Sequence, residues 1–308
     1  MAVNFPTIGD LQGFARLMYK NLYYQSTGMK FIDEAYLNDV KSTMGGETPV
    51  IEIMKQKDTT LNTTRGTVDI TTSLTPALAT YDNVLVNLTD LKMDYSFQLS
   101  TLVTVTNIMG ALEGQIKLKE AQIAYETDVY IFGKYVAAIT GNENGSEAYT
   151  TGQMITWAPS TQQEYIDLLN YLKALLFNRK IYADFRLGLD AIEYGKFVSA
   201  LTSLLKYETK TGVMGVELGD IAEAYGISII PVNSTVLSTA DVSGNTVGFF
   251  ANPVAAVGDY FFTAMTEWAG NYPGRPGAYV LEGNVLFGAQ IVRPEAAIRL
   301  VKSSVISA

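Results

Sequence analysis

The side chains that most enzymes use for acid–base and nucleophilic chemistry are scarce in this chain. It contains no histidine and no cysteine. This removes the commonest general base and metal ligand, and with them thiol nucleophiles, disulfides, iron–sulfur clusters and zinc fingers. Ser, Lys, Asp and Glu remain as possible catalytic groups.

Three acidic residues lie close enough in sequence to suggest a carboxylate pair or a hard-metal site. They are Asp184, Asp190 and Glu193. Carboxylates can act as general acids and bases, and their oxygens suit Mg²⁺ or Ca²⁺. No partner base or motif accompanies them, and acidic residues at this density usually lie on a solvated surface. We therefore predict a surface role for all three.

A spaced set of glycines suggests a phosphate-binding loop at first sight. The glycines are Gly212, Gly215 and Gly219. A phosphate loop needs a Gly-Lys-Ser/Thr motif directly after a strand, and neither feature is present. An ordinary connection is the better interpretation.

The aromatic residues also have two interpretations. Trp157, Trp268 and the 19 tyrosines could form a surface that stacks on sugars or bases. Buried aromatic residues and subunit contacts explain them more simply, because Tyr and Trp are enriched at protein interfaces. The sequence thus predicts no catalytic residue, no cofactor-binding residue and no metal ligand, and the chain is predicted not to be an enzyme.

Composition points to a globular chain with a real core. Of 308 residues, 48% are hydrophobic and 17% charged, which argues against a mostly disordered protein. There are 22 basic and 31 acidic side chains, for a net charge of −9. A chain this acidic is not expected to grip DNA. Its first residues do not resemble a signal peptide, and no run approaches the roughly 20 apolar residues of a membrane span, so we expect a cytoplasmic product with no membrane partner.

The first third of the chain predicts an arm and a ribbon. Residues 1–47 form the arm, which is helical over Ile8–Tyr24. Val50–Met54 and Val84–Leu88 have strand composition, and the threonine-rich stretch Asp58–Thr80 lies between them. This pattern indicates a long two-stranded excursion that cannot make its own core and needs a neighbour.

Residues 98–139 give the strongest helix signal. Their apolar side chains keep to nearly one face over about ten turns, which would span about 60 Å at 1.5 Å per residue. The residues of this face are Leu102, Val105, Met109, Leu112, Ile116, Ile123, Val129, Phe132 and Val136. The charged residues expected off it are Glu113, Lys117, Glu120 and Lys134.

From Gln153 onward the pattern is mixed α+β. The expected helices are Thr161–Asn178, with Thr161 as its cap, Ala191–Leu205 and Leu218–Tyr225. The expected strands are Ile181–Phe185, Ile227–Val232, Phe249–Ala256, Val280–Phe287 and Ala289–Val292.

This order of elements resembles that of tailed-phage major capsid proteins, the Hong Kong 97 type of fold, over nearly the whole chain. Two local patterns add to the resemblance. Gly219–Val232 looks like the family's short helix, glycine turn and strand. Gly283–Ile298 looks like its common ending, in which paired strands lead into a proline, an acid and small apolar residues.

The resemblance implies an α+β fold in five parts. Residues 1–47 would be the N-terminal arm, 48–97 the extended β-loop with peripheral-domain strands, and 98–152 the spine helix of the peripheral domain. Residues 153–279 would be the axial domain, and 280–308 the closing peripheral-domain strands.

It also implies a structural role. The chain would self-assemble as hexamers and pentamers into an icosahedral capsid around double-stranded DNA, which it would adjoin without sequence-specific binding. A portal and a separate scaffolding protein are expected partners, because only about 47 residues precede the ribbon. Assembly would take place in the host cytoplasm and the product would reside in the virion. Some family members crosslink a loop lysine to a distant asparagine; Lys55 and Lys57 lie in the ribbon, but no acceptor stands out, so this chemistry is not carried over.

Two other functions remain open. An encapsulin-like compartment would have the same fold and enclose cargo protein in place of a genome. A soluble hydrolase using serine or carboxylates is the other alternative, which a catalytically active monomer would support.

Overall fold

The computed structural model describes residues 21–22, 25–33, 50–56, 81–100, 108–139, 153–182, 184–208, 223–224, 226–262, 266–272 and 275–302. Its helices are η1 (Gly28–Phe31), α3 (Ile108–Ala138), α4 (Gln162–Asn178), α5 (Ala191–Glu208), α6 (Ser234–Ala240), η3 (Pro253–Ala255) and η4 (Pro294–Ala296). Its strands are β1 (Val50–Gln56), β2 (Tyr81–Asn87), β3 (Leu91–Ser100), β4 (Gln153–Thr156), β5 (Phe185–Asp190), β6 (Glu223–Ala224), β7 (Ile227–Val232), β8 (Thr246–Ala251), β9 (Ala256–Phe262), β10 (Thr266–Tyr272), β11 (Arg275–Ile291) and β12 (Ala297–Val301).

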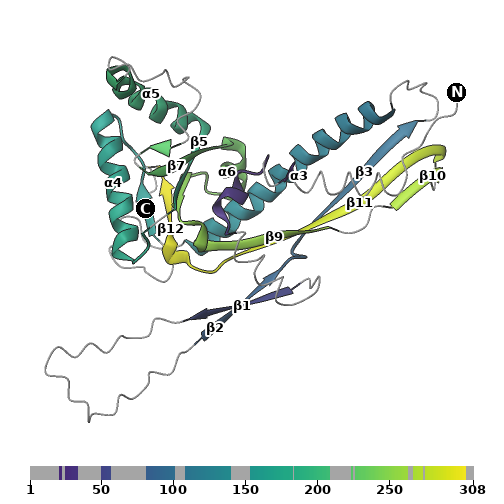
Figure 1. The fold of residues 1–308 in the computed structure, drawn as a ribbon, viewed down its shortest axis with the longest axis horizontal. Coiled ribbons are helices and arrows are strands. Elements are labelled where there is room, and N and C mark those ends of the chain that lie inside the picture. Colours follow the sequence, from purple (N-terminus) through teal and green to yellow (C-terminus); the bar gives the residue numbers. More distant parts are fainter. Residues whose placement is uncertain are drawn as a thin grey trace, which may run out of the picture.

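These elements confirm the α+β class. A six-stranded mixed sheet in the order β4-β12-β8-β5-β7-β6 forms one end of the molecule. Helices α4 and α5 cover one face of this sheet, and α6 lies on the other face, next to α3 (Figure 1). The described helices include none that is both long and apolar enough to cross a membrane.

Side chains on the two faces of the six-stranded sheet belong to two different cores. Strand β5 sends Leu187 and Leu189 toward α4, where they pack with Leu169, Leu172 and Leu176. Strand β8 shows the alternation clearly, because Phe250 joins this cluster whereas Phe249 joins the cluster around α3. The period-two pattern of a strand thus connects two hydrophobic layers through one sheet.

Helix α4 and its cap follow the sequence closely. The Thr161 side chain accepts from the Glu164 backbone N–H, and the Glu164 carboxylate accepts from the Thr161 backbone N–H in return, which makes a complete capping box. These bonds satisfy donors that the first turn of a helix would otherwise leave unpaired. The predicted cap at Thr161 is confirmed, and so is strand Ile227–Val232, which is β7.

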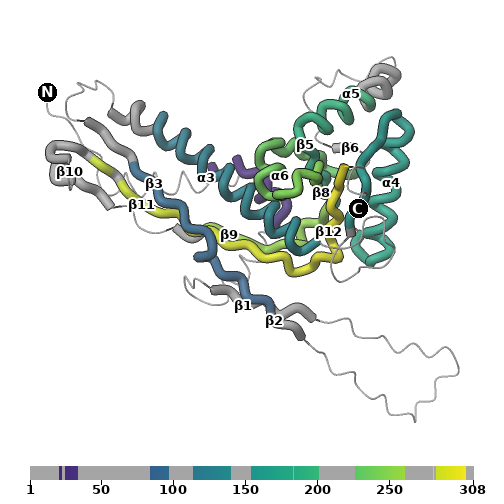
Figure 2. Tube along the Cα trace, turned by 180° about the vertical axis from the view of Figure 1, so that it is seen from behind, coloured from purple at the N-terminus to yellow at the C-terminus, as the bar shows by residue number. Residues whose placement is uncertain are grey.

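A second sheet extends along α3. Strand β11 is 17 residues long and pairs with β3 on one side and with β10 and β9 on the other, always antiparallel. In Figure 2 this sheet and α3 run together away from the six-stranded sheet. The long helix therefore has a sheet beneath it for most of its length, as expected of a spine.

The spine helix starts later than its apolar pattern suggested. Residues 98–100 belong to β3, paired with Ala278–Val280 of β11, and residues 101–107 lie outside the described part. Met93, Tyr95, Phe97 and Leu99 alternate with polar residues, which is the strand period. In the sequence this strand-like alternation runs almost directly into the helical pattern of α3. With 31 residues, α3 spans about 46 Å at 1.5 Å per residue.

The base of the predicted ribbon is confirmed. Strands β1 and β2 pair antiparallel, from Val50 opposite Asn87 to Gln56 opposite Tyr81. They project from the body near the point where β3 begins (Figure 1). The threonine-rich stretch Asp58–Thr80 lies outside the described residues, as does most of the arm helix predicted at Ile8–Tyr24.

The two strands predicted at Val280–Phe287 and Ala289–Val292 are one continuous strand, β11, which runs through Gly288 and ends at Ile291. Three other predicted elements in the second half were wrong in part. Strand β5 begins at Phe185 rather than Ile181, because Lys180 and Asp184 have positive φ angles of 63° and 53°, which an extended strand does not have. Residues Glu223–Ala224 form β6, not a helix, and residues 209–222 lie outside the described part.

The third is the strand predicted at Phe249–Ala256, which is two strands. Asn252 ends β8, and its side chain accepts from the Val254 backbone N–H to start η3. Pro253 has no N–H to continue the strand ladder, so the chain turns there before β9 begins at Ala256.

The five-part division of the chain stays a prediction, and the strand pairings refine it. Strands β9 and β10 fall within 153–279 but pair with β11 in the sheet under α3. Strand β12 falls within 280–308 but pairs with β4 and β8 in the six-stranded sheet. The chain thus crosses between the two sheets more often than a linear division allows.

Candidate functional site

The three carboxylates singled out in the sequence do not form one site. Asp184 directly precedes β5 and Asp190 is its last residue, so the strand separates them. The Asp190 carboxylate accepts from the Ile192 backbone N–H at 2.8 Å and from the Ser234 hydroxyl at 2.6 Å, and so joins the starts of α5 and α6. Glu193 pairs with Lys196 at 2.7 Å on the surface of α5. Asp190 and Glu193 thus each have a local structural role.

Those of the other candidates that the structure describes form no chemical site. Among the described residues, no group of three or more Asp or Glu gathers in one place. Gly212, Gly215, Gly219 and Lys57 lie outside the described part, and nothing is described for the side chains of Lys55 and Trp268. Trp157 is buried and packs edge-on against Tyr165, with ring centroids 5.8 Å apart. A buried indole of this kind is a core residue rather than a stacking platform.

A buried carboxylate on α3 holds the end of the arm. Asp128 accepts from the Ser26 hydroxyl, from the Thr27 backbone N–H at 3.1 Å and hydroxyl at 2.7 Å, and from the Gly28 N–H at 2.8 Å. Burial raises the pKa of Asp128, and these hydrogen bonds oppose that rise. A Cβ at Gly28 would lie 2.9 Å from Ile131, so only glycine allows this approach.

A second buried acid lies two turns earlier on the same face. The Glu120 carboxylate accepts from the Asn21 amide at 3.2 Å and from the Gln25 amide at 3.4 Å. Burial raises the pKa of Glu120, against the lowering effect of these amides and of Lys117. The prediction that Glu120 lies off the buried face was wrong, because its side chain is fully buried against the arm.

The segment after this contact is wedged between the two parts of the molecule. The Phe31 ring packs edge-on against Phe132 of α3, with centroids 5.7 Å apart. The Tyr135 hydroxyl donates to the Phe31 carbonyl at 2.8 Å. On the other side, a Cβ at Gly188 of β5 would lie 2.8 Å from the Phe31 ring. Phe31 therefore joins the spine helix to the six-stranded sheet.

The base of the ribbon is anchored on the same body. Val86 and Leu88 are buried together with Val257 and Val292. The Asp90 carboxylate, in the turn after β2, accepts from the Tyr130 hydroxyl at 3.0 Å and pairs with Lys134 at 3.5 Å. The ribbon thus leaves the body from a fixed base, although Leu85 on β2 is 63% exposed.

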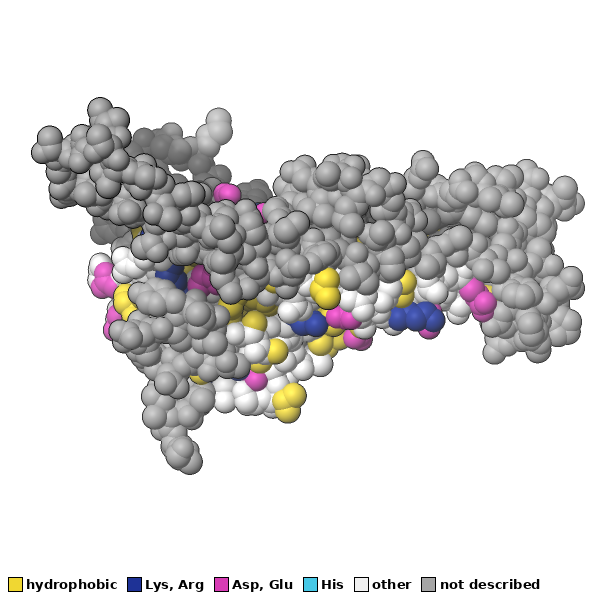
Figure 3. Space-filling view, turned by 90° about the horizontal axis from the view of Figure 1, so that it is seen from below, with side chains coloured by type: hydrophobic (Ala, Val, Ile, Leu, Met, Phe, Trp, Pro, Cys, Tyr) yellow, Lys and Arg dark blue, Asp and Glu magenta, His cyan; other side chains and the backbone are white. Residues whose placement is uncertain are grey.

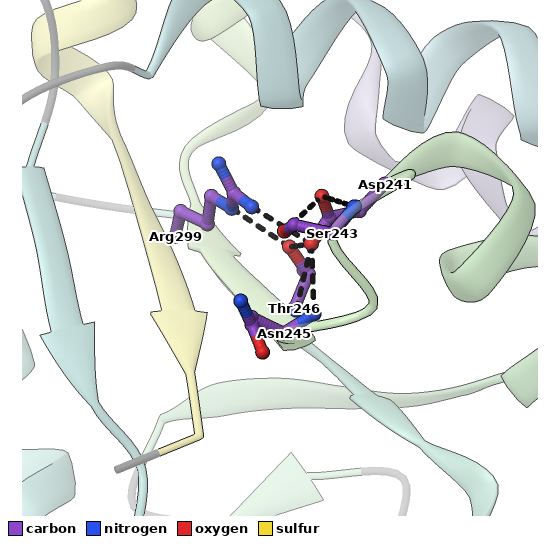
Figure 4. A network of polar contacts seen from close by, with 5 residues as sticks. All are labelled: Asp241, Ser243, Asn245, Thr246 and Arg299. Atoms are coloured by element: carbon purple, nitrogen blue, oxygen red, sulfur yellow. Dashed lines mark hydrogen bonds and ion pairs between the residues drawn. The ribbon is translucent and has the colours of Figure 1, made fainter. Parts of the chain in front are cut away.

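The most heavily bonded carboxylate lies at the turn between α6 and β8. Asp241 accepts from the backbone N–H groups of Ser243, Asn245 and Thr246, and from the Ser243 and Thr246 hydroxyls (Figure 4). Arg299 of β12 donates to the same carboxylate at 2.8 Å. Burial raises the pKa of Asp241, but the hydrogen bonds and the Arg299 charge outweigh it and hold the pKa well below its ordinary value.

Sequence reasoning missed these carboxylates, although a signal exists for two of them. The buried face of α3 runs through Ile116, Ile123, Ile131 and Tyr135, and Glu120 and Asp128 recur at the same helical spacing. Acids in register with an apolar stripe need buried donors. The sequence does not say that the donors lie about a hundred residues upstream.

Comparison with known proteins finds similar structures but no similar sequence. No family model and no curated protein sequence matches the chain. Among solved structures it is similar to a chain of Mycobacterium phage Che8, at 14% identity and a TM-score of 0.60, covering 89% of this chain and 90% of that one. A chain from the capsid of cyanophage P-SCSP1u has 14% identity and a TM-score of 0.61, and the match covers 83% of this chain and 84% of that one. A chain from the mature capsid of bacteriophage PhiM1 has 13% identity and a TM-score of 0.57, and the match covers 84% of this chain and 83% of that one.

The matched parts cover 83–89% of this chain and 83–90% of the counterparts. The fold that the order of elements suggested from the sequence is therefore confirmed. The chain has the α+β fold of tailed-phage major capsid proteins, the Hong Kong 97 type.

Proposed function

We propose that the chain is the structural subunit of a phage capsid, which self-assembles as hexamers and pentamers into an icosahedral shell around double-stranded DNA. The observation that carries this proposal is the match, over 83–89% of the chain, to chains that include subunits of the P-SCSP1u and PhiM1 capsids. In this function the shell resides in the virion, is assembled in the host cytoplasm and needs a portal and a separate scaffolding protein. The chain itself performs no catalysis.

The ribbon and the arm support the proposal on physical grounds. A two-stranded ribbon is marginal by itself, and β1–β2 leaves the body with Leu85 largely exposed. The arm is clamped at Ser26–Gly28, so it leaves the spine helix from a fixed point. Extensions with fixed bases favour contacts with neighbouring copies.

The charge distribution fits a shell that adjoins DNA without gripping it. The chain has a net charge of −9. On the face in Figure 3, the described lysines and arginines lie among acidic and apolar side chains rather than in a field of one sign. Tight phosphate binding needs such a basic field.

The test is assembly of the purified protein. Size-exclusion chromatography and negative-stain microscopy, with the chain expressed alone and with a candidate scaffold, should show hexamer-sized or larger species and shells. A strictly monomeric protein under every condition would overturn the proposal. Shells that copurify with an enzyme cargo in place of DNA would support the encapsulin-like alternative instead.

A further inference from the structure

One exposed apolar side chain stands on an unusually well supported turn. Val242 is 99% exposed and lies between α6 and β8. The turn around it is closed by the bonds to Asp241, and Gly244 takes a φ of +67°. A rigid turn loses little conformational entropy on binding, so it can present a single valine effectively. We call residues 241–245 the knob.

A groove of about 800 Å³ lies between the loop before α4 and the start of α5. It is open to solvent, and small residues of α5 leave room in it. Its lining includes Pro159, Tyr165, Ile192, Gly195, Ser199 and Ala200. Ser160 and Lys196 also line it, and the Lys196 charge is paired with Glu193 at 2.7 Å. Ile192 is 66% exposed although it is a large apolar residue. The groove suits a small apolar group on a narrow support.

The knob and the groove lie at the same end of the strands of the six-stranded sheet. Both adjoin the end of β12: the Trp157 N–H, two residues before the groove, donates to the Val301 carbonyl at 2.8 Å, and the Lys302 N–H donates to the Asn245 carbonyl at 2.9 Å. They belong to opposite flanks, because α4 and α5 cover one face of the sheet and α6 the other (Figures 1 and 2).

This placement matches what a ring requires. In a ring, a rotation about the axis relates each copy to the next, so a given feature lies at the same distance from the axis in every copy. The two halves of a head-to-tail contact must therefore lie at the same end of the subunit and on opposite flanks. The charges also match. Lys302 is exposed beside the knob, and the Asp241 charge is compensated by Arg299. Beside the groove, the Lys196 charge is paired with Glu193, and the exposed Glu164 carboxylate, bonded to Ser160 of the lining, remains as an acidic group for Lys302 to meet.

We propose that Val242 of one copy binds in the groove against Ile192 of the next copy around a capsomer axis. This inference rests on the proposed function and names the contact within its rings. The occupant of the groove is a second copy of this chain.

The chain has no cysteine, so engineered thiols report single contacts. We would prepare the full-length variants V242C, I192C and V242C/I192C, and treat the assembled fraction from size-exclusion chromatography with a short bis-maleimide. The double variant should give a ladder on a denaturing gel that ends at the pentamer and the hexamer. A co-assembled mixture of the two single variants should stop at the dimer. The pair L118C/I192C is the control, because Leu118 is 69% exposed and lies on α3, an element that does not carry the knob.

The outcomes separate the contact from the function. Assembled species without the ladder, or with an equal ladder from L118C/I192C, overturn the contact and leave the proposed function standing. A link from V242C to a different protein, such as a scaffold, also overturns it. If size-exclusion chromatography shows only monomers with no link, both proposals fail together.

Discussion

The guanidinium of Arg299 and the carboxylate of Asp241 form an ion pair at 2.8 Å, with side chains only 11% and 4% exposed. The pair connects β12, close to the end of the described chain, to the turn that carries Val242. Arg299 also donates through Nε to the Thr246 hydroxyl, which itself donates to Asp241. Each charge therefore keeps its partner and its hydrogen bonds, which is the condition under which a buried pair is tolerated.

We expect the substitution Asp241→Asn to destabilise the fold strongly. It leaves the Arg299 charge buried without a counter-ion, a change that costs roughly 3–5 kcal/mol when one partner of a buried pair is removed. Denaturant unfolding would measure the loss. The matched control is Glu193→Gln, which breaks the pair with the largely exposed Lys196. It should change stability by roughly 0–1 kcal/mol. Similar effects for the two variants would contradict the role given to the buried pair.

The same residue predicts how stability depends on pH. The folded state holds the pKa of Asp241 below its ordinary value, so the folded chain binds this proton less readily than the unfolded chain. Its stabilising contribution is present above the unfolded pKa of about 4 and is lost as the pH falls toward the folded pKa. The difference in unfolding free energy between the wild type and Asp241→Asn should therefore be largest near neutral pH and shrink below about pH 4. A difference that stays constant down to acid pH would rule out this linkage.

The regular parts of the fold could be predicted because their signals are local. The Thr161 cap, the strand Ile227–Val232 and the paired base of the ribbon each depend on a few consecutive residues. The start of α3 could not be placed, because the alternation that ends β3 is followed almost at once by the helical pattern. Hydrophobic periodicity alone does not show at which residue the strand period of β3 ends and the helical period of α3 begins.

The polar contacts could not be predicted, because they join residues far apart in sequence. Asp128 binds donors about a hundred residues upstream, and Asp241 binds an arginine 58 residues downstream. A single sequence carries no information on such pairs. It shows only that an acid falls on an apolar face and must find donors there.

We predict that Asp128→Asn releases the end of the arm from α3. An asparagine offers one acceptor oxygen in place of two, and its amide points donors at the Thr27 N–H and hydroxyl. Leaving buried donors unsatisfied costs about 1–3 kcal/mol. Hydrogen exchange by mass spectrometry should show faster exchange at residues 26–32, with little change in α4 and the six-stranded sheet. Glu126→Gln, an exposed acid on the same helix, is the control. Unchanged exchange in the arm segment would mean that Phe31 holds the segment without Asp128.

The last prediction separates folding from assembly at the ribbon. Strands β1 and β2 are tied to the body through Val86, Leu88 and Asp90, so the body does not depend on what lies beyond Gln56 and Tyr81. Replacing Asp58–Thr80 by a short Gly/Ser turn should leave a soluble chain that unfolds cooperatively. The circular dichroism spectrum of the folded chain should stay unchanged in shape. The shortened chain should no longer form shells.

The physical reason is that the removed stretch has few large aliphatic residues of its own. They are Leu61, Val68, Ile70 and Leu74. Burying each fully against a neighbouring copy would contribute roughly 1.5–3 kcal/mol. Part of that gain is used to order the ribbon, and the remainder, repeated around a ring, decides whether the lattice closes. Electron microscopy reports the shells and thermal unfolding reports the fold. Loss of the cooperative transition would place Asp58–Thr80 in the core of its own subunit, and normal shells from the shortened chain would show that assembly depends on other contacts.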